Sequence, residues 1–337
     1  MRCIILFMDQ DTKYMRKAIA LAKRGFGKTS PNPIVGAVLV KNGRIVGEGW
    51  HKLSGGPHAE INAIASAGKR AAGATLYVTL EPCSTTGKTP PCTDAVISAN
   101  IAKVIVGCLD ANPAHAGKGI KILEEAGIKS ITGVDEKRCL ELNEAFFYWI
   151  RTGMPFVLLK TGMTLDGKTA TSKGKSKWIT GTESRKSVQQ LRRWADAIMV
   201  GGETVRKDSP SLTVRNNKNQ PLHNWNQPER IIASHSLTPE KAEKLMEPGK
   251  KPIIINADTP EEWKKSLKKL GKAEITALLV EGGSELASSL INAGVVNKIA
   301  FYIAPKILGG KNSKTVIGGP DPGSLEEAFN LKDMRIK

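Results

Sequence analysis

Three potential metal ligands in the first third of the chain constrain its fold more than any other feature. His58 stands two residues before Glu60, and Cys83 and Cys92 follow, each directly after a proline. One imidazole and two thiolates are three of the four ligands of a tetrahedral Zn²⁺ ion, and a catalytic site leaves the fourth position to water. A fold that uses these ligands has to bring three separate segments to one point.

The local patterns predict how these segments are built. Residues 75–80 are rich in β-branched and aromatic side chains, which is typical of a strand. His58 and Cys92 each open a stretch that we expect to be helical, 59–65 and 92–99. The positive end of a helix dipole lowers the pKa of a thiol, so a helix N-terminus favours a thiolate ligand.

Two other interpretations of the cysteines are buried thiols without metal and a structural zinc site. A structural site takes four protein ligands, and no fourth Cys or His adjoins these three. We therefore predict a catalytic Zn²⁺ that lowers the pKa of a bound water to roughly 7. Glu60 is then the proton carrier. His-x-Glu followed by Pro-Cys is the pattern of zinc nucleobase deaminases, in which the glutamate is not a ligand.

The spacing of the two cysteines narrows the choice among the zinc deaminases. The usual pattern is Cys-x-x-Cys, whereas residues 84–91 separate Cys83 from Cys92. The run 79–92, together with 31–36 and 47–51, resembles the deaminase half of the bifunctional riboflavin-biosynthesis deaminase/reductase family. The resemblance implies an N-terminal α/β/α sandwich of the cytidine-deaminase type. It also implies substrate contacts at Asn32, His51, Lys88, Asp110 and Asn112.

Length and composition limit the classes of protein to which the chain can belong. A chain of 337 residues favours two domains, and no apolar run approaches the length of a membrane span. Residues 3–7 are too short for a signal-peptide core. Five cysteines without framework spacing indicate a reducing compartment, so we expect a cytoplasmic protein.

The formal net charge of +18 favours an anionic partner. Aromatic residues make up only 5% of the chain, too few for extensive base stacking. Many basic residues between 240 and 272 alternate with acidic ones, which is typical of a solvated helical face. A small phosphorylated substrate also suits a basic protein, and the resemblance implies that it is a phosphorylated pyrimidine. We further expect no membrane and a homo-oligomer. A zinc-dependent nucleic-acid deaminase and a nucleic-acid-binding protein with a structural zinc are the alternatives.

The order of patterns predicts a first domain over 1–151. Strands at 34–40 and 44–50, joined by an Asn-Gly turn, precede alternating helices and strands. This order gives a mixed sheet with helices on both faces. A second domain over 152–337 begins with a strand at 156–160, and we expect the two domains to be packed together.

Glycines follow apolar strands twice in the second half. Gly201-Gly202 comes after 197–200, and Gly282-Gly283 comes after 277–281 and before a helix at 284–292. Such a turn lets backbone N–H groups approach phosphates, although a purely structural turn is the alternative. Together with 160–168 and 208–215, these segments resemble the reductase half of the same family, which uses NADPH and has an α/β fold similar to dihydrofolate reductase.

The resemblance implies two sets of contacts in the second half. The NADP contacts are Gly162, Trp178, Thr204, Asp208, Gly283, Ser284, Glu285, Leu286, Ala287, Ser288 and Ser289. The substrate contacts are Ser176, Arg192, Leu212, Arg215 and Glu281. Two arginines suit a phosphate, and an indole suits a flat cofactor ring. A solvated helix face for Arg192 and core packing for Trp178 are the alternatives.

The reaction implied by the resemblance has two steps. The first deaminates 2,5-diamino-6-ribosylamino-4(3H)-pyrimidinone 5′-phosphate, and the second reduces the ribosyl group of the product to ribityl with NADPH. The chain ends at Lys337, where the family carries one more strand. This leaves open a second domain without its last strand, and therefore an active deaminase with an impaired reductase.

Overall fold

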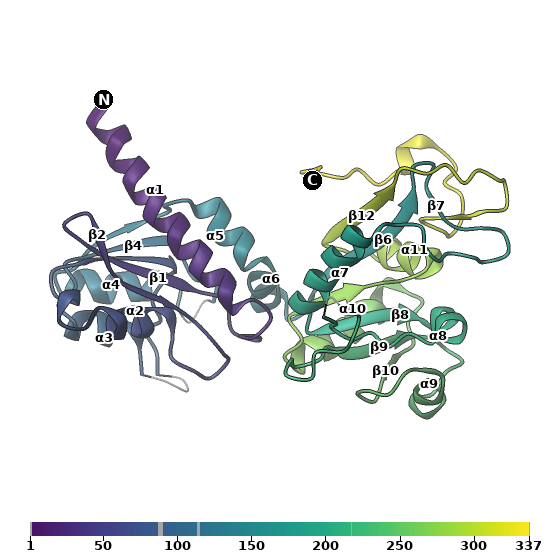
Figure 1. Ribbon diagram of the computed structural model, residues 1–337, viewed down its shortest axis with the longest axis horizontal. Helices are drawn as coiled ribbons and strands as arrows, with labels where there is room; N and C mark the ends of the chain where they lie inside the picture. The colour runs from purple at the N-terminus through teal and green to yellow at the C-terminus, as the bar shows by residue number, and fades with distance from the viewer. Residues whose placement is uncertain (1, 87–89, 113–114, 217, 337) are drawn as a thin grey trace.

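The computed structural model describes residues 2–86, 90–112, 115–216 and 218–336, which form two lobes joined near residue 152 (Figure 1). Each lobe is built on one sheet. The strand order is β2-β1-β3-β4-β5 in the first lobe and β10-β9-β8-β11-β6-β12 in the second. Segments of the first sheet all precede those of the second along the chain.

The first sheet is mixed, as the sequence predicts. Its strands are β1 (Gly36–Lys41), β2 (Arg44–Trp50), β3 (Thr75–Leu80), β4 (Lys103–Cys108) and β5 (Lys129–Thr132). β1 pairs antiparallel with β2 and β3, whereas β3, β4 and β5 run parallel. The β1–β2 turn holds Asn42 and Gly43 at positive φ, which fits the Asn-Gly hairpin signal.

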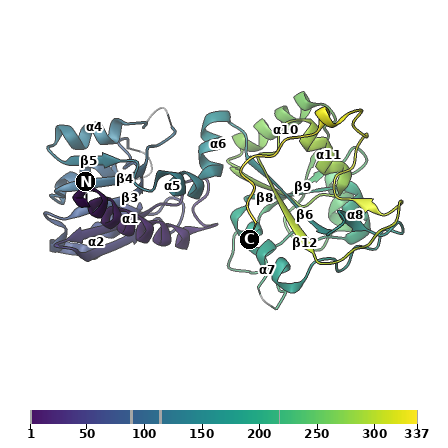
Figure 2. The ribbon, with the colours of Figure 1, turned by 90° about the horizontal axis from the view of Figure 1, so that it is seen from above.

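Helices cover both faces of the first sheet (Figure 2). One face carries α2 (Ala59–Ala67), α3 (Cys92–Ser98) and α4 (Lys118–Glu125), and the other carries α1 (Arg2–Ala22) and α5 (Glu136–Leu142). α6 (Glu144–Thr152) leads to the second lobe. The two apolar cores on opposite faces confirm the predicted sandwich.

The second sheet is parallel at every pairing between neighbouring strands. It contains β6 (Phe156–Thr164), β8 (Ala197–Gly201), β9 (Glu229–Ala233), β10 (Ile253–Ile255), β11 (Ala277–Val280) and β12 (Lys298–Ala304). β11 is buried along its whole length, as expected for a parallel strand covered on both faces. A separate pair joins β7 (Lys168–Ala170) to β13 (Lys314–Thr315).

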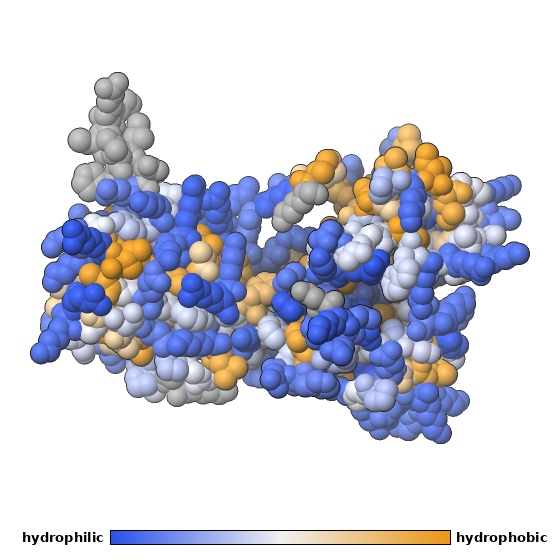
Figure 3. All heavy atoms as spheres, viewed as in Figure 1, coloured by the Kyte–Doolittle hydropathy of each residue, from blue (hydrophilic) through white to orange (hydrophobic). Residues whose placement is uncertain are grey.

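The helices of the second lobe are α7 (Thr182–Trp194), α8 (Gly202–Asp208), α9 (Pro239–Leu245), α10 (Pro260–Lys272) and α11 (Ser284–Asn292). α10 starts at a capping box between Thr259 and Glu262. It buries Trp263 and Leu267 and exposes most of its lysines. The charged segment 240–272 therefore has solvated helical faces, and the visible surface is largely hydrophilic (Figure 3).

Short 3₁₀ helices occupy Lys23–Gly25, Gly68–Ala71 and Leu325–Glu327. The lobes touch where the Trp149 indole donates to the Gly271 carbonyl at 2.9 Å and where the Lys28 ammonium lies 5.7 Å from the centre of the Trp225 ring. The predicted packing of the two halves is therefore present. In the part of the chain that the structure describes, no helix has the length and apolar character to cross a membrane.

Asn143 connects the α5–α6 junction to the segment before β1. Its side chain accepts from the Ile34 N–H and donates to the Ile34 carbonyl, both at 2.9 Å, and it is buried. We expect Asn143→Ala to lower the free energy of unfolding by about 1–3 kcal/mol, since two buried backbone groups lose their partner. Urea denaturation measures the change. The exposed amide of Gln10 provides a control, because Gln10→Ala should shift the transition little.

Candidate active site

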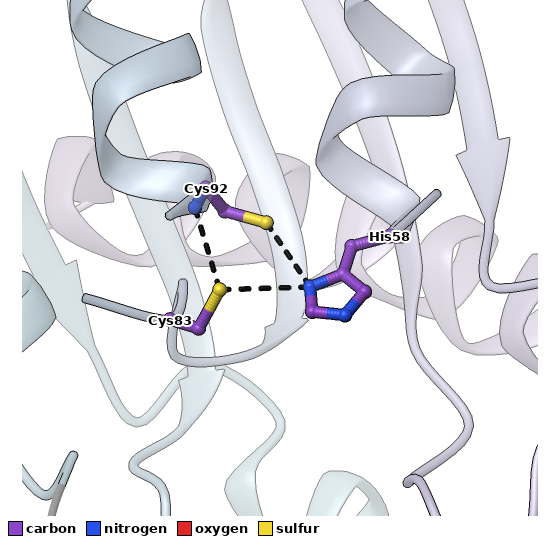
Figure 4. A group of neighbouring side chains, drawn as sticks. All are labelled: His58, Cys83 and Cys92. Atoms are coloured by element: carbon purple, nitrogen blue, oxygen red, sulfur yellow. Dashed lines mark hydrogen bonds between the residues drawn. The ribbon is translucent and has the colours of Figure 1, made fainter. Parts of the chain in front are cut away.

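His58, Cys83 and Cys92 converge at one edge of the first sheet (Figure 4). His58 is the N-cap residue of α2, Cys92 is the first residue of α3, and Cys83 follows the end of β3. The His58 Nδ1 atom lies 3.2 Å from Cys92 Sγ and 3.5 Å from Cys83 Sγ. Both ligands predicted to sit at helix N-termini do so, and the three ligand atoms lie within 4.8 Å of one another.

The two sulfur atoms lie close enough to share one proton when no metal is bound. Hydrogen bonds from the Cys92 thiol, from His58 and from the Cys92 backbone N–H lower the pKa of Cys83 to about 4. The hydrogen bond to Cys83 and burial raise the pKa of Cys92. Two adjacent thiolates repel one another, and a divalent cation removes that repulsion. Thiolate and imidazole are the donors that Zn²⁺ prefers, so the residues fit this ion.

A fourth protein ligand is not found among the described residues, since the group contains only these three. The nearest further imidazole is His51, whose ring centre lies 5.3 Å from that of His58. Both nitrogens of His51 are engaged. Nδ1 donates to the Pro57 carbonyl at 3.1 Å, and Nε2 accepts from the Asn32 amide at 3.3 Å. This set leaves one ligand position for a molecule that reacts, which is the pattern of a catalytic site.

Glu60 lies in the first turn of α2, two residues from His58. Its side chain is 3% exposed. Burial raises the pKa of Glu60 to about 7, partly opposed by the nearby His58. A carboxyl whose pKa lies near neutrality can both accept and donate a proton, which general acid–base catalysis requires.

Asn32 and His51 are brought together beside the metal ligands, as their hydrogen bond shows. His51 is 2% exposed, and burial lowers its pKa, so the neutral ring is favoured. Its side chain therefore orients Asn32 and joins it to the Pro57 backbone. Asn62, which sequence reasoning missed, donates to the carbonyls of Trp50 and Pro57 and braces the same turn.

Asp110 and Asn112 lie in the segment after β4. The Asn112 N–H donates to the Asp110 carboxylate at 2.8 Å, and burial raises the pKa of Asp110. The Asp110 N–H in turn donates to Glu81, a residue of the run 79–92 for which the sequence predicts no role. Lys88 lies outside the described residues.

A second cluster occupies the second lobe at the end of β11. Arg192 of α7 contacts the Glu281 carboxylate through Nε at 2.6 Å and Nη2 at 3.1 Å, and Lys160 of β6 lies 3.7 Å from it. Burial favours the neutral acid, but Arg192 and Lys160 outweigh it and lower the pKa of Glu281 to about 2. Arg192 is thus part of a largely buried ion-pair network and not of a solvated helix face.

The remaining predicted substrate residues occupy nearby segments. Leu212 is buried at positive φ. Arg215 contacts Ser211 and Glu247 through Nη2 and donates from Nε to the Thr213 hydroxyl at 3.3 Å. Ser176 is exposed in the segment before α7. Sequence reasoning did not find Glu247, because an isolated acid 32 residues along the chain gives no local signal.

Two helix N-termini lie at the carboxyl ends of neighbouring strands. α8 follows β8 and carries Thr204 and Asp208, and α11 follows β11 after the Gly282-Gly283 turn. Backbone N–H groups at helix N-termini suit phosphates, and the carboxyl edge of an open parallel sheet is where nucleotides bind. Trp178 is 68% exposed, so its ring is available to a ligand and does not pack in the core.

The other predicted cofactor residues divide by environment. Gly162 lies on β6, where a Cβ would approach the Thr180 methyl group to 3.2 Å. Gly283 and Glu285 are exposed, and Ser284 is partly exposed at the start of α11. Leu286, Ala287 and Ser288 are buried, while the Ser289 hydroxyl accepts from the Trp263 indole at 2.9 Å. Side chains in the last group serve packing, so among the predicted cofactor residues of this segment the exposed ones lie at the start of α11.

These features define a class. A His-Cys-Cys set beside a buried glutamate, on a mixed sheet between helices, is that of a zinc-dependent nucleobase deaminase, here joined to a second α/β lobe suited to a nucleotide cofactor. Family models agree: residues 8–108 match "Cytidine and deoxycytidylate deaminase zinc-binding region", and residues 155–337 match "RibD C-terminal domain".

Relatives of known name cover almost the whole chain. The riboflavin biosynthesis protein RibD of Aquifex aeolicus is 44% identical over 98% of this chain and 96% of its own, and that of Escherichia coli is 41% identical over 97% and 96%. The chain therefore belongs to the RibD family of riboflavin biosynthesis. It is a zinc-dependent deaminase joined to an NADPH-dependent reductase.

Solved structures agree along the full length. Acinetobacter baumannii RibD superposes with a TM-score of 0.87 at 38% identity, covering 96% of this chain and 94% of that one. A Thermotoga maritima protein named diaminohydroxyphosphoribosylaminopyrimidine deaminase/5-amino-6-(5-phosphoribosylamino)uracil reductase gives 0.84 at 37% identity, covering 98% and 95%. The expected cytidine-deaminase-like and reductase folds are confirmed.

Cys83→Ser tests the metal site. We expect the variant to purify with far less than about one Zn²⁺ per chain, because a hydroxyl does not replace a thiolate ligand at neutral pH. Elemental analysis of the purified protein measures the metal. Cys108→Ser is the matched control: Cys108 is buried in the same lobe and donates to the Thr79 carbonyl, so its loss should leave the zinc content unchanged. Full zinc in the Cys83 variant would exclude Cys83 as a ligand.

Proposed function

We propose that the first lobe deaminates 2,5-diamino-6-ribosylamino-4(3H)-pyrimidinone 5′-phosphate. The second lobe then reduces the product, 5-amino-6-(5-phosphoribosylamino)uracil, at its ribosyl group to give the ribityl compound. The name of the Thermotoga maritima relative, which matches along nearly the whole chain, supports both substrates. The single observation that carries the first step is the convergence of His58, Cys83 and Cys92 beside Glu60.

Glu60 moves the protons of the deamination. Zn²⁺, when bound by His58, Cys83 and Cys92, supplies an activated water. Glu60 accepts a proton from that water and delivers it to the ring nitrogen next to the attacked carbon. Glu60 then takes the second proton of the former water from the hydroxyl on the attacked carbon and transfers it to the exocyclic amine. The amine leaves as ammonia, and a carbonyl remains at that carbon. The burial of Glu60 supports this role, since it favours a carboxyl that gains and loses a proton near pH 7.

Asn32, oriented by His51, is proposed to hold the pyrimidine ring in the first lobe. Asp110 and Asn112 are proposed to contact the substrate from the segment after β4. Lys88 is proposed to meet the phosphate, because an ammonium is a suitable point charge for that group. The four of these residues that the structure describes, Asn32, His51, Asp110 and Asn112, come from segments that precede or follow strands of one sheet.

The second lobe is proposed to hold NADPH along the carboxyl edge of its sheet. The cofactor contacts are Gly162, Trp178, Thr204, Asp208 and the segment 283–289, with the backbone of its first turn toward the phosphates. Bound NADPH supplies the hydride for the ribosyl carbon. Ser176, Leu212 and Arg215 are proposed to position the phosphorylated substrate, and Arg192 and Glu281 to complete that site.

We further propose a domain boundary at residues 151/152, in the last turn of α6 and shortly before the start of β6. A homo-oligomer is supported by the edge strand β12, whose Phe301 and Ile303 are exposed. A cytoplasmic location is supported by the free thiols of Cys108 and Cys139. Similarity along both lobes favours the bifunctional enzyme over an impaired reductase and over a nucleic-acid deaminase.

Glu60→Gln tests the proton role. We expect ammonia release from the diaminopyrimidine phosphate to fall by about 10²–10⁴-fold, because the amide cannot accept the proton of the water. The zinc content should stay at that of the unmodified protein. A coupled ammonia assay measures the rate and elemental analysis the metal. Turnover at the unmodified rate would exclude this role for Glu60.

Arg215→Ala tests the separation of the two sites. We expect KM of the reductase for its phosphorylated substrate to rise about ten- to a hundredfold, the cost of losing one or two hydrogen bonds to a charged group. Deamination should not change, since Arg215 lies in the other lobe. NADPH oxidation followed by absorbance gives KM. Lys218→Ala, an exposed cation nearby, is the control. Equal loss of both activities would contradict separate sites.

A further inference from the structure

Glu81 is the most highly hydrogen-bonded carboxylate near the metal ligands that the described segments contain. It directly follows β3, and its backbone N–H donates to the Cys108 carbonyl at 3.0 Å, which extends the β3–β4 ladder by one step. The side chain is 4% exposed. Glu81 also stands two residues before Cys83, so its place is fixed with respect to the metal site.

Four backbone N–H groups donate to this carboxylate. Oε1 accepts from Gly119 at 2.9 Å and from Ile120 at 3.4 Å, and Oε2 accepts from Gly117 at 3.0 Å and from Asp110 at 3.2 Å. A charged acceptor with four donors in a buried place is a strong interaction. It offsets the cost of removing the carboxylate from water.

Part of this arrangement is a helix cap supplied from another segment. α4 has no side-chain cap of its own, since Gly117 occupies the N-cap position. The Gly119 and Ile120 N–H groups belong to the first turn of α4, where a negative charge is favourable. Asp110, however, lies outside the helix, so capping alone does not explain the contact with its N–H.

Asp110, which contacts Glu81 through its N–H, also contacts Asn112 through its side chain. The Asp110 carboxylate accepts from the Asn112 N–H at 2.8 Å. A Cβ at Gly119 would overlap the Pro82 carbonyl and lie 3.2 Å from Glu81 Oε1, so the turn that carries Cys83 and the start of α4 are in close contact. One carboxylate therefore connects the metal-ligand turn with the segment that holds Asp110 and Asn112.

We propose that Glu81 is a positioning residue of the deaminase site. Its carboxylate sets the distance between the metal ligands and the substrate contacts of Asp110 and Asn112. The expected effect on KM rests on the proposed deamination. The expected effect on the structure rests only on the four hydrogen bonds. Glu81 does not touch the reacting atoms in this role; it acts through the backbone of the segment after β4.

Glu81→Gln is the test, because the amide has the same shape but only one accepting oxygen. Two of the four backbone N–H groups then face the amide NH₂ group, which donates hydrogen bonds and cannot accept them. We expect KM for the diaminopyrimidine phosphate to rise about tenfold, with kcat within about threefold of the unmodified enzyme. Zinc content and NADPH oxidation by the second lobe should not change. Glu124→Gln, the same substitution at an exposed site on α4, is the control.

Hydrogen exchange gives a readout that does not depend on activity. In Glu81→Gln, the amides of Asp110, Gly117 and Gly119 should exchange faster, while those of β3 should keep their protection. Gly119→Ala provides a second variant: the added Cβ would overlap the Pro82 carbonyl oxygen and lie 3.2 Å from Glu81 Oε1, so it should separate the Glu81 carboxylate from the N–H groups of α4 and raise KM in the same way.

An unchanged KM in a folded, zinc-loaded Glu81→Gln would overturn the proposal. Loss of zinc would also overturn it, because the carboxylate would then support the ligand turn and not the substrate segment. If the unmodified protein releases no ammonia from the pyrimidine phosphate, the proposed function fails instead. Hydrogen exchange alone then decides the role of Glu81: faster exchange supports it, and unchanged exchange refutes it.

Discussion

The first lobe depends on the close approach of two sulfur atoms to one imidazole. Cys83 and Cys92 each lie within 3.5 Å of one His58 nitrogen, and they cannot both be ionised there without a cation. The fold holds them in place from three sides: the end of β3 and the first residues of α2 and α3. A sandwich whose helices start at the same edge of the sheet makes this convergence possible, and the deaminase chemistry depends on it.

The two lobes use charge in opposite ways. In the first lobe, burial of Glu60 outweighs the attraction of His58 and raises the pKa of Glu60 to about 7. The carboxyl can therefore exchange protons near neutral pH. In the second, Glu281 is equally enclosed but faces Arg192 and Lys160, and their attraction keeps it ionised. The same side chain is therefore suited to carrying protons in one environment and to acting as a fixed charge in the other.

Short-range patterns predicted much of this structure. Residue composition and the positions of Gly and Pro predict the strand at 75–80, the helix at 284–292 and the helix N-termini at His58 and Cys92. The structure has each of these elements at the predicted place. The ion pair of Arg192 with Glu281 and the four hydrogen bonds of Glu81 were not predictable. Arg192 and Glu281 are 89 residues apart, and the partners of Glu81 lie 29 to 39 residues further along the chain, so only the tertiary fold brings them together.

The position of β12 has a consequence for the growing chain. β12 (Lys298–Ala304) pairs with β6 (Phe156–Thr164), the first strand of the same sheet, whereas β1 to β5 all come from residues 36–132. Because synthesis proceeds from the N-terminus and domains fold as units, the metal-binding lobe can be complete while the reductase sheet still lacks its edge. During that interval β6 has an open edge, and long-range parallel pairing of this kind is slow. The second half of the chain is thus the part whose sheet closes last.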